Sequence, residues 1–343
     1  MVNPPAGYVN NDGLSNYNIT YIIMAFQIYE DQFYSGMLEV EMQQAELFNA
    51  GSQNTMRVIP REHIGDFSKE AFFTETDDVV TRRDITSSSA GTATELSSDE
   101  LIGVKLYRRY QFDKKLTDIK RIGYTEQEYS FLVGQQIARA RMVEMLNTGL
   151  LGVATCLGLN AKNYSDITGA TTNTLNYDSL PALLAKFGDR SGDLRQIVGH
   201  SKPIHDLLGD SFNTETDNVA GFSINTGGIP TLNRGLAMTD SGSLVEEDGV
   251  ESGVDSYKTL VLAQNGLILE QSEAETVWGG QVDGLENLVV RVQGEFGYTI
   301  KVKGFQYQSA TANPNAATLA TAGSWKQVAA DTKSTAGVYI ETA

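Results

Sequence analysis

The sequence predicts an α+β protein in which one long helix joins a β-rich part to an α/β part. Apolar residues recur at helical spacing from residue 125 to residue 151, whereas residues 52–123 show short β-type stretches without a sustained helical period. Helices and strands alternate after Gly158. We expect five regions: 1–50, an N-terminal arm and helix; 51–123, an extended β excursion; 124–158, the long helix; 159–285, an α/β domain; 286–343, a returning β segment and C-terminal tail.

The composition indicates a folded protein that does not bind nucleic acid tightly. The 343 residues are 41% hydrophobic, and 26 Lys and Arg against 43 Asp and Glu give a net charge of −17, which repels nucleic acid and anionic membranes. The single Cys156 excludes an internal disulfide and a Cys-rich zinc site. The opening residues lack the features of a signal peptide, and the longest apolar run, residues 21–26, is far below the roughly 20 residues of a membrane span. We therefore expect a soluble protein made inside the cell.

The N-terminal region divides into an arm and a helix. The first 19 residues are polar and rich in Asn, Gly and Pro, which is typical of an extended arm. Residues 21–48 are expected to be helical, because apolar residues recur there at spacings of three and four: Ile22, Phe26, Tyr29, Phe33, Met37 and Val40.

Residues 51–123 predict a β excursion with little core of its own. Residues 101–112 alternate loosely, as expected for a strand with one wet face, and residues 87–94 resemble a loop tip. Several large apolar side chains in this region would need a neighbouring molecule to cover them: Phe67, Phe72, Phe73, Leu106, Tyr107 and Phe112.

Charge is unevenly distributed along the chain. Residues 101–123 carry seven basic and two acidic residues, whereas residues 240–286 carry eleven acidic residues and only Lys258 as a base. This separation suits contact between opposite patches of neighbouring copies, although both stretches are also consistent with ordinary solvated surfaces.

The long helix has the strongest local signal. Thr125 and Glu128 form a capping box, in which each side chain accepts a hydrogen bond from the other residue's backbone N–H. A helix from Glu126 to about Leu151 would measure about 40 Å at the standard rise.

After Gly158 we expect short helices over residues 178–187 and 204–208, the second ended by Gly209, and strands over residues 195–199 and 235–239. Asn265-Gly266 predicts a hairpin that pairs residues 257–263 with 267–270. A further strand pair, 288–293 and 298–306, is expected around Gly294 and Gly297, followed by an Ala/Thr-rich tail with few core residues.

The sequence offers few catalytic parts. His200 and His205 lack metal-site spacing, His63 stands apart from them, and Cys156 lies in an apolar stretch without a nearby His. No nucleophile elbow or phosphate-binding glycine loop is present. We expect no catalytic, cofactor-binding or metal-ligating residues.

Taken in order, these parts resemble the major capsid proteins of tailed bacteriophages with the Hong Kong 97-type fold. Residues 81–110, from Thr-Arg-Arg-Asp to Tyr-Arg-Arg-Tyr, look like the E-loop of that family, and TEQEYSFLVGQQIARARMVEMLNTGLL, residues 125–151, looks like its spine helix. RQIVGHSKPIHDLL, residues 195–208, with Gly-Ile-Pro-Thr-Leu downstream, looks like its axial domain. The similarity covers residues 20–307 and is one of architecture, because no single motif in it is diagnostic.

The resemblance implies a structural subunit that assembles into an icosahedral shell around double-stranded DNA, without enzymatic activity. Its partners would be copies of itself in hexameric and pentameric capsomers, together with portal, scaffolding and decoration proteins, and it would enclose DNA without sequence-specific binding. The protein would be made in the host cytoplasm and reside in the virion. Some family members crosslink an E-loop lysine to a neighbouring subunit, for which Lys69 or Lys105 would be the candidate. The expected inter-subunit contact residues are Phe67, Lys69, Phe72, Phe73, Arg82, Arg83, Lys105, Arg108 and Arg109.

Two alternatives remain open at this point. An encapsulin, a bacterial nanocompartment shell of the same fold, would hold an enzyme cargo in place of DNA. An acidic α/β hydrolase or sugar-binding protein would require paired carboxylates in a cleft, for which Glu246 and Glu247 are poor candidates.

Overall fold

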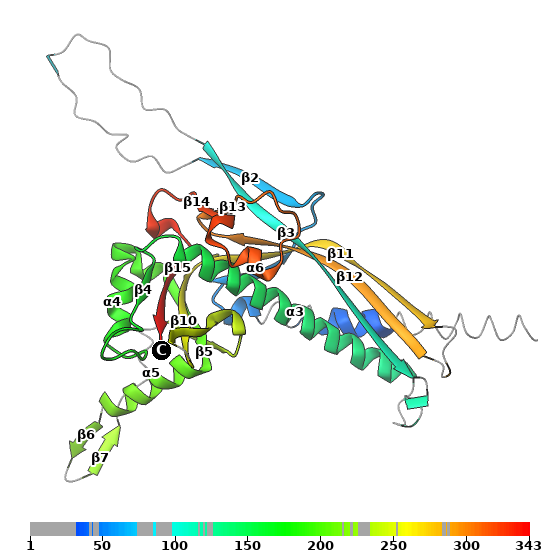
Figure 1. Ribbon diagram of the computed structural model, residues 1–343, viewed down its shortest axis with the longest axis horizontal. Helices are drawn as coiled ribbons and strands as arrows, with labels where there is room; N and C mark the ends of the chain where they lie inside the picture. Colours follow the sequence, from blue (N-terminus) through cyan, green and yellow to red (C-terminus); the bar gives the residue numbers. More distant parts are fainter. Residues whose placement is uncertain are drawn as a thin grey trace, which may run out of the picture. The chain divides into compact units, whose positions relative to one another are not determined.

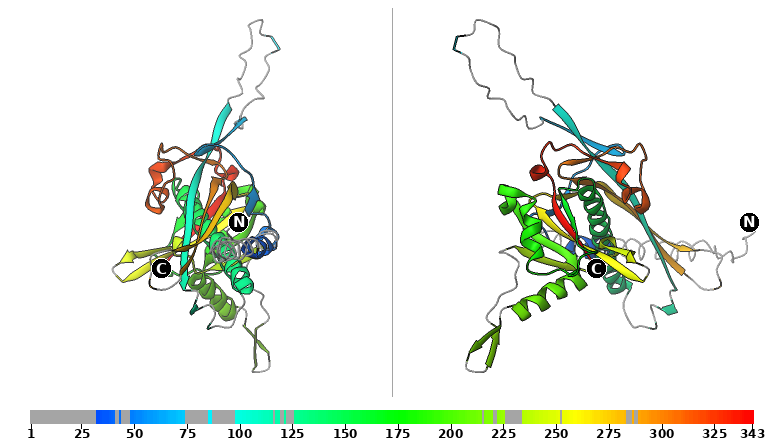
Figure 2. Two further views of the ribbon diagram at one scale, coloured as in Figure 1. Left: turned by 90° about the vertical axis from the view of Figure 1, so that its right-hand side faces the viewer. Right: turned by 60° about the vertical axis from the view of Figure 1, so that its left-hand side comes forward.

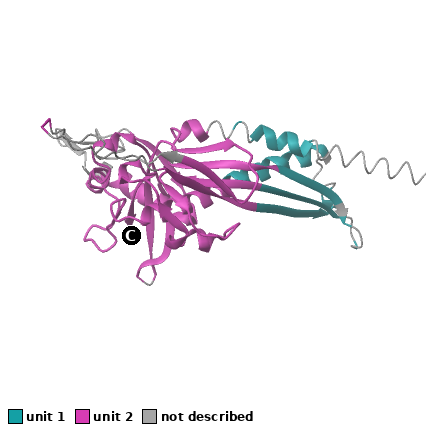
Figure 3. Ribbon diagram, turned by 90° about the horizontal axis from the view of Figure 1, so that it is seen from above, with its two compact units in different colours: residues 1–44, 108–142, 275–296 teal, residues 45–107, 143–274, 297–343 magenta. Residues whose placement is uncertain are grey.

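The structure is a computed structural model. It describes residues 32–40, 43, 48–73, 85–86, 98–115, 117–118, 121, 126–214, 216–219, 222–225, 234–251, 253–282, 286 and 289–343. The chain forms two compact units, coloured separately in Figure 3. Unit 1 comprises residues 1–44, 108–142 and 275–296, and unit 2 comprises residues 45–107, 143–274 and 297–343.

The predicted long helix is present as α3, Glu126–Gly158 (Figure 1). It continues beyond the expected end near Leu151, because Val153, Cys156 and Leu157 are fully buried and extend its apolar surface. At 33 residues the helix is about 50 Å long. Thr125, half of the proposed capping box, lies outside the described residues.

Unit 1 has its own small core. Residues 32–40 are helical, in agreement with part of the helix expected over residues 21–48, whose earlier residues lie outside the described part of the chain. Phe33, Met37 and Val40 are buried against Ala138 of α3, with Tyr110 and other half-buried apolar residues packed around them. Gly134 permits the close approach, since a Cβ there would lie 2.3 Å from the Phe33 carbonyl oxygen.

A seven-stranded sheet runs in the order β1-β11-β12-β13-β14, with β3 paired to β12 and β2 paired to β3. Strand β1 lies parallel to β11, whereas β2 and β3 form an antiparallel pair. The strands are β1 (Met56–Pro60), β2 (Phe67–Phe73), β3 (Ser98–Lys115), β11 (Leu267–Val282), β12 (Val289–Val302), β13 (Phe305–Tyr307) and β14 (Trp325–Gln327).

The prediction of two strands around Gly294 and Gly297 was wrong, because β12 runs through both residues without interruption. A Cβ on Gly294 would lie 2.2 Å from the ring of Tyr110, and one on Gly297 would lie 2.9 Å from the carboxylate of Glu273. These two glycines do not mark turns; each lies where a neighbouring side chain crosses close to the strand.

A six-stranded sheet in unit 2 runs in the order β4-β15-β10-β5-β8, with β9 paired to β10. Helices α4 (Ser179–Ala185) and α5 (Ser201–Thr214) contribute Leu183 and Leu207 to the apolar cluster that also holds Val261 and Val338 of the sheet. The strands are β4 (Tyr164–Asp166), β5 (Leu194–His200), β8 (Gly235–Thr239), β9 (Val245–Glu251), β10 (Val254–Ala263) and β15 (Gly337–Thr342). A separate antiparallel pair is formed by β6 (Thr216–Val219) and β7 (Phe222–Asn225).

The predicted hairpin around Asn265-Gly266 was also wrong. Both strands exist, but β10 belongs to the six-stranded sheet and β11 to the seven-stranded one. Asn265 does take the left-handed conformation that the turn signal implies, with φ of 56°. Its backbone N–H, however, donates to the carbonyl of Asn54 at 2.8 Å, so the turn passes the chain from one sheet to the other.

Two further differences concern unit 2. Helix α5 continues through Gly209 to Thr214, where the sequence had suggested an end at that glycine. The tail, expected to hold few core residues, contains the buried Leu319 of α6 (Ala316–Leu319) and the buried Trp325, whose indole N–H donates to the Leu319 carbonyl at 2.9 Å.

Among the described helices, none combines the length and the apolar character that crossing a bilayer requires.

Candidate assembly site

The antiparallel pair β2–β3 is the described part of the predicted β excursion (Figure 1). Its register runs from Phe67 opposite Val104 to Phe73 opposite Ser98. Only residues 85–86 of the connection over residues 74–97 are described. The predicted contact residues Arg82 and Arg83 therefore lie outside the described part, as do the side chains of Phe72 and Phe73.

A buried charge cluster fixes the base of this hairpin. The ammonium group of Lys301 lies 2.8 Å from Glu70 of β2 and 2.8 Å from Glu270 of β11. Arg61 pairs with the same two carboxylates, at 3.0 Å from Glu270. The side chains of Lys301 and Glu270 are only 3% and 1% exposed, so each charge depends on its partner.

The pKa shifts agree with this arrangement. The hydrogen bond from Lys301 lowers the pKa of Glu70, with burial acting in the opposite direction. The hydrogen bond to Glu70 raises the pKa of Arg61. Both shifts favour the ionised forms of Glu70 and Arg61 at the root of the hairpin.

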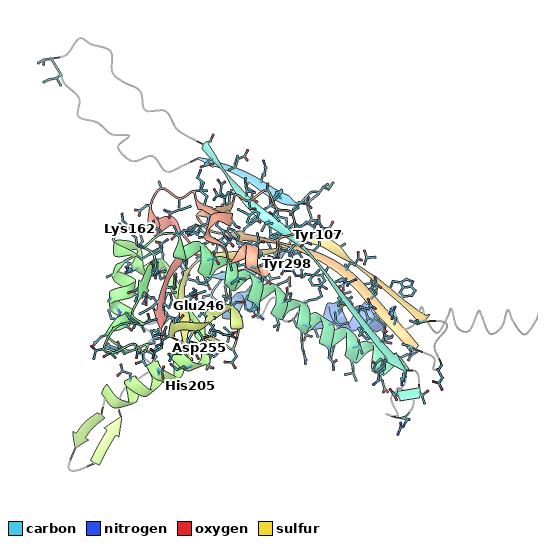
Figure 4. All side chains as sticks on the ribbon, viewed as in Figure 1. Tyr107, Lys162, His205, Glu246, Asp255 and Tyr298 are labelled. Carbon is cyan, nitrogen blue, oxygen red and sulfur yellow. The ribbon has the colours of Figure 1, made fainter. Side chains whose placement is uncertain are left out.

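Lys105 of β3 adds a second anchor. Its ammonium lies 3.2 Å from Glu273 and 5.0 Å from the ring centroid of Tyr107. The Tyr107 hydroxyl, labelled in Figure 4, donates to Asp66 at 2.9 Å. Gly103 makes room for this packing, since a Cβ there would lie 2.7 Å from the Lys301 side chain. Because Lys105 is 5% exposed, its charge is satisfied within its own chain, and its role in contact with a neighbour stays a prediction.

The expectation that the excursion cannot cover its own apolar residues was wrong for its inner part. Leu106 is fully buried, and the ring of Phe67 stacks on Tyr307 at 6.2 Å between centroids. Phe112 packs against the core of unit 1, and Tyr107 remains 38% exposed. The returning segment β12–β13 supplies this cover, which sequence patterns alone do not indicate.

The outer part of the hairpin is different. Lys69 and Glu100 face each other across the two strands at 3.5 Å, with side chains 61% and 55% exposed. Ala71 and Ser98 are also exposed. Of the two predicted arginines on the later part of β3, Arg109 is exposed and Arg108 half-buried.

Sequence reasoning missed a buried pair in unit 1. Arg141 of α3 is 6% exposed and forms an ion pair with Glu275. The Tyr110 hydroxyl donates to the same carboxylate, and burial raises the pKa of Tyr110. The Arg141 guanidinium also lies 4.6 Å from the ring centroid of Phe296. The available signal was Gly294, whose missing side chain admits the Tyr110 ring.

The acidic stretch over residues 240–286 is therefore not one patch. Glu270, Glu273 and Glu275 are paired inside the chain with Lys301, Lys105 and Arg141. By contrast, the carboxylates of β9 and its neighbours are exposed, and Glu246 alone of that strand pairs with Lys258, at 3.0 Å, within the described residues.

His63 and Cys156 are enclosed by or bonded to other parts of the chain. His63 lies 2.6 Å from the Thr299 hydroxyl, and burial lowers its pKa. Cys156 is fully buried, which raises the pKa of its thiol. Nowhere in the described ranges do three or more His, Cys, Asp or Glu side chains gather in a way that could hold a metal ion.

Comparisons with known proteins agree with this architecture. The model of the Gp13-like family, described as major capsid protein 13-like, matches residues 25–339. The capsid of Ralstonia phage GP4 aligns over 84% of this chain and 87% of its own, with 11% identity and a TM-score of 0.51. A chain in the structure of Microbacterium phage Oxtober96 aligns over 73% of this chain and 84% of its own length, with 17% identity and a TM-score of 0.49. No curated protein matches the sequence.

Proposed function

The chain belongs to the Gp13-like family of major capsid proteins, and from this premise we propose that its copies join one another through the outer part of the β2–β3 hairpin. The chain is a structural subunit of a bacteriophage capsid shell and has the Hong Kong 97-type fold. The viral shell therefore replaces the encapsulin alternative, and the family supports a structural role in place of the acidic hydrolase or sugar-binding protein.

The contrast between the two ends of the hairpin carries the proposal. At its base, the buried ammonium groups of Lys301 and Lys105 hold β2 and β3 through ion pairs with the partly exposed Glu70 and Glu273. Farther out, Lys69, Ala71, Ser98 and Glu100 are exposed, and β2 pairs with no strand other than β3 among the described residues. A two-stranded ribbon is at best marginally stable in water, so a neighbouring subunit would stabilise this part by covering it.

The fixed base has a consequence for assembly. A buried ammonium group that loses its carboxylate is strongly destabilising, so the pairs of Lys301 and Lys105 favour one direction in which the hairpin leaves the sheet. A defined direction reduces the conformational entropy lost when the outer part docks on a second copy. Lys69, Phe67, Phe72, Phe73, Arg82, Arg83, Lys105, Arg108 and Arg109 remain the proposed contact residues, and those at the outer end are the ones we expect to touch a neighbour directly.

The remaining partners follow from the shell. We expect hexameric and pentameric capsomers, and a virion location after synthesis in the host cytoplasm. The net charge of −17 supports enclosure of DNA without tight or sequence-specific binding. Portal, scaffolding and decoration proteins complete the set of expected partners.

The test introduces a second thiol at the outer hairpin, because the single native thiol is buried. Cys156 is fully buried, so an Ala71→Cys variant carries one reactive thiol, at the outer hairpin. The full chain is expressed, and particles are separated from free subunits and imaged. We expect the introduced thiol to react readily with a maleimide in free subunits and at least about tenfold more slowly in particles, because the neighbour excludes the reagent.

The unassembled fraction of the same variant is the control, and the unsubstituted chain measures any reaction of Cys156. Equal reaction rates in particles and free subunits would contradict hairpin docking. A small, monodisperse oligomer of the unsubstituted chain in light scattering would contradict self-assembly itself.

A further inference from the structure

The six-stranded sheet of unit 2 carries opposite charge at its two ends. Strand β10 runs from Val254 at one end to Ala263 at the other, a distance of about 30 Å at the usual rise per residue. The pairing registers place Thr342 and His200 at the first end, and Gly337 and Leu194 at the second. Each end is therefore built from several strands and the turns that follow them.

The first end, called here the acidic end, contains the hairpin of β9 and β10, drawn in yellow in Figure 2. The Asp240 side chain is 78% exposed, and Glu247, Asp248 and Glu251 are exposed as well. Nine acidic and two basic residues occupy this end: Asp166, Asp206, Asp240, Glu246, Glu247, Asp248, Glu251, Asp255 and Glu341, with Lys202 and Lys258.

The second end, called here the basic end, lies around the turn at Asn265 and the 3₁₀ helix Gly188–Asp193. Figure 4 shows Lys162 at this end and Glu246 and Asp255 at the other. Seven basic and three acidic residues occupy it: Lys162, Lys186, Arg190, Arg195, Arg234, Lys303 and Lys333, with Asp189, Asp193 and Asp331.

Some charges pair within their own end, such as Lys333 with Asp189 and Lys202 with Asp206, but each end keeps a net charge. The ammonium groups of Lys186 and Lys303 contact only backbone carbonyls, those of Ala161 and Gln264, among the described residues. Burial lowers the pKa of Lys303, while the charges of Arg190 and Asp193 nearby act in opposite directions. At the acidic end, Glu247 and Glu251 have no cation within 4.0 Å in the part of the chain that the structure describes.

We propose that the acidic end of one copy docks against the basic end of the next copy. Contacts between two different surfaces of the same chain generate closed rings when the rotation between copies closes, and rings are the units of a shell. A second copy of the chain matches both ends, because each copy brings one acidic end and one basic end. Duplex DNA would match the basic end alone and leave the acidic end without a counter-charge. The inference rests on the shell function and adds a contact separate from the β2–β3 hairpin.

Charge reversal provides a test with an internal rescue. The acid-end variant is Glu247→Lys/Glu251→Lys, and the basic-end variant is Lys162→Glu/Lys186→Glu. Two substitutions do not reverse the net sign of a whole end, but either variant alone sets like charges against each other where its substituted residues face the unchanged end of the neighbour, so we expect at least about a tenfold loss of protein in particles. The chain carrying all four substitutions exchanges the signs on both sides of that contact and should recover assembly. An equimolar mixture of the two variants restores opposite signs in rings with an even number of subunits in which the variants alternate, so hexameric rings should form again.

The matched controls are Glu295→Lys and Lys326→Glu, which reverse exposed charges outside both ends. Thermal melting followed by circular dichroism verifies that each variant is folded. Independently of particle formation, analytical ultracentrifugation of the mixed variants measures their direct association, which neither variant should show by itself.

The results distinguish self-assembly from end-to-end docking. Absence of particles from the unsubstituted chain would count against self-assembly, while a complex between the two variants would still support end-to-end docking. The docking inference is overturned if both variants assemble as the unsubstituted chain does, or if the folded variants neither rescue nor bind each other. It is also overturned if the basic-end variant assembles normally and loses only retained DNA.

Discussion

The buried cluster at the base of the hairpin makes the strongest quantitative prediction. Replacing Lys301 with Met removes the cation that lies 2.8 Å from both Glu70 and Glu270. Arg61 still contacts Glu270 at 3.0 Å, but its side chain is 53% exposed and shares its charge with Glu70. Glu270, at 1% exposure, is then left largely uncompensated in a dry environment. We expect a loss of about 3 kcal/mol in the free energy of unfolding, or roughly a hundredfold in the ratio of folded to unfolded chains.

The assay is urea unfolding of the free subunit, followed by tryptophan fluorescence. Trp325 is 2% exposed and lies in the same unit as Lys301, whereas Trp278 is 55% exposed and should contribute little change. Lys303→Met is the matched control, because Lys303 has only a carbonyl contact at 3.4 Å; we expect a change within about 0.5 kcal/mol.

The double variant Lys301→Met/Glu270→Leu distinguishes a lost charge from lost packing. Removing both members of the pair leaves no uncompensated charge, so most of the lost stability should return. The reasoning is refuted if Lys301→Met and Lys303→Met unfold at the same urea concentration, or if the double variant is as unstable as Lys301→Met alone.

Three further predictions concern other parts of the chain. Gly294→Ala should destabilise unit 1 by about 2 kcal/mol, because the new Cβ would lie 2.2 Å from the Tyr110 ring. Gly51→Ala is the control, since a Cβ there would have nothing within 4 Å. Equal melting temperatures of the two variants would contradict close packing of Tyr110 on Gly294. Cys156 should react with thiol reagents only after denaturation, because burial both encloses the thiol and raises its pKa; reaction of the native chain at the unfolded rate would disprove this. Burial lowers the pKa of His63 below 6.5, so as the pH falls the unfolded chain takes up a proton before the folded chain does. The free energy of unfolding should therefore decrease as the pH drops below about 6.5. His63→Gln should lessen the accompanying fall in melting temperature, and an unchanged pH profile would exclude His63 as its source.

Local patterns were sufficient for several elements of the fold. The long helix was predicted from apolar spacing within α3, and a β excursion was predicted from the absence of that spacing before it. Both signals depend on residues close together in sequence, and local propensity decides such elements. Phe33, Met37 and Val40 were identified by spacing as one helix face, and they are buried together in the core of unit 1.

Pairing between distant residues was decided only in the folded chain. Asn265-Gly266 indicated a turn correctly, yet the strands on either side belong to different sheets, because β1 and β15 compete for their edges from elsewhere in the sequence. Strand β15 itself was not predicted, although it lies beside β10 in the middle of the six-stranded sheet.

The charges that position the β2–β3 hairpin also depend partly on local sequence and partly on tertiary structure. Composition and spacing revealed a basic stretch and an acidic stretch, and the membership of a capsid family agrees with a chain built for contact with copies of itself. Which carboxylates are internal was not encoded in any local pattern: Glu270 and Glu273 look like Glu247 in sequence, but the first two meet Lys301 and Lys105 across strands. Sequence alone determined where charge and helical periodicity lie, and tertiary structure decided which charges are paired, since pairing depends on strand register between segments far apart in the chain.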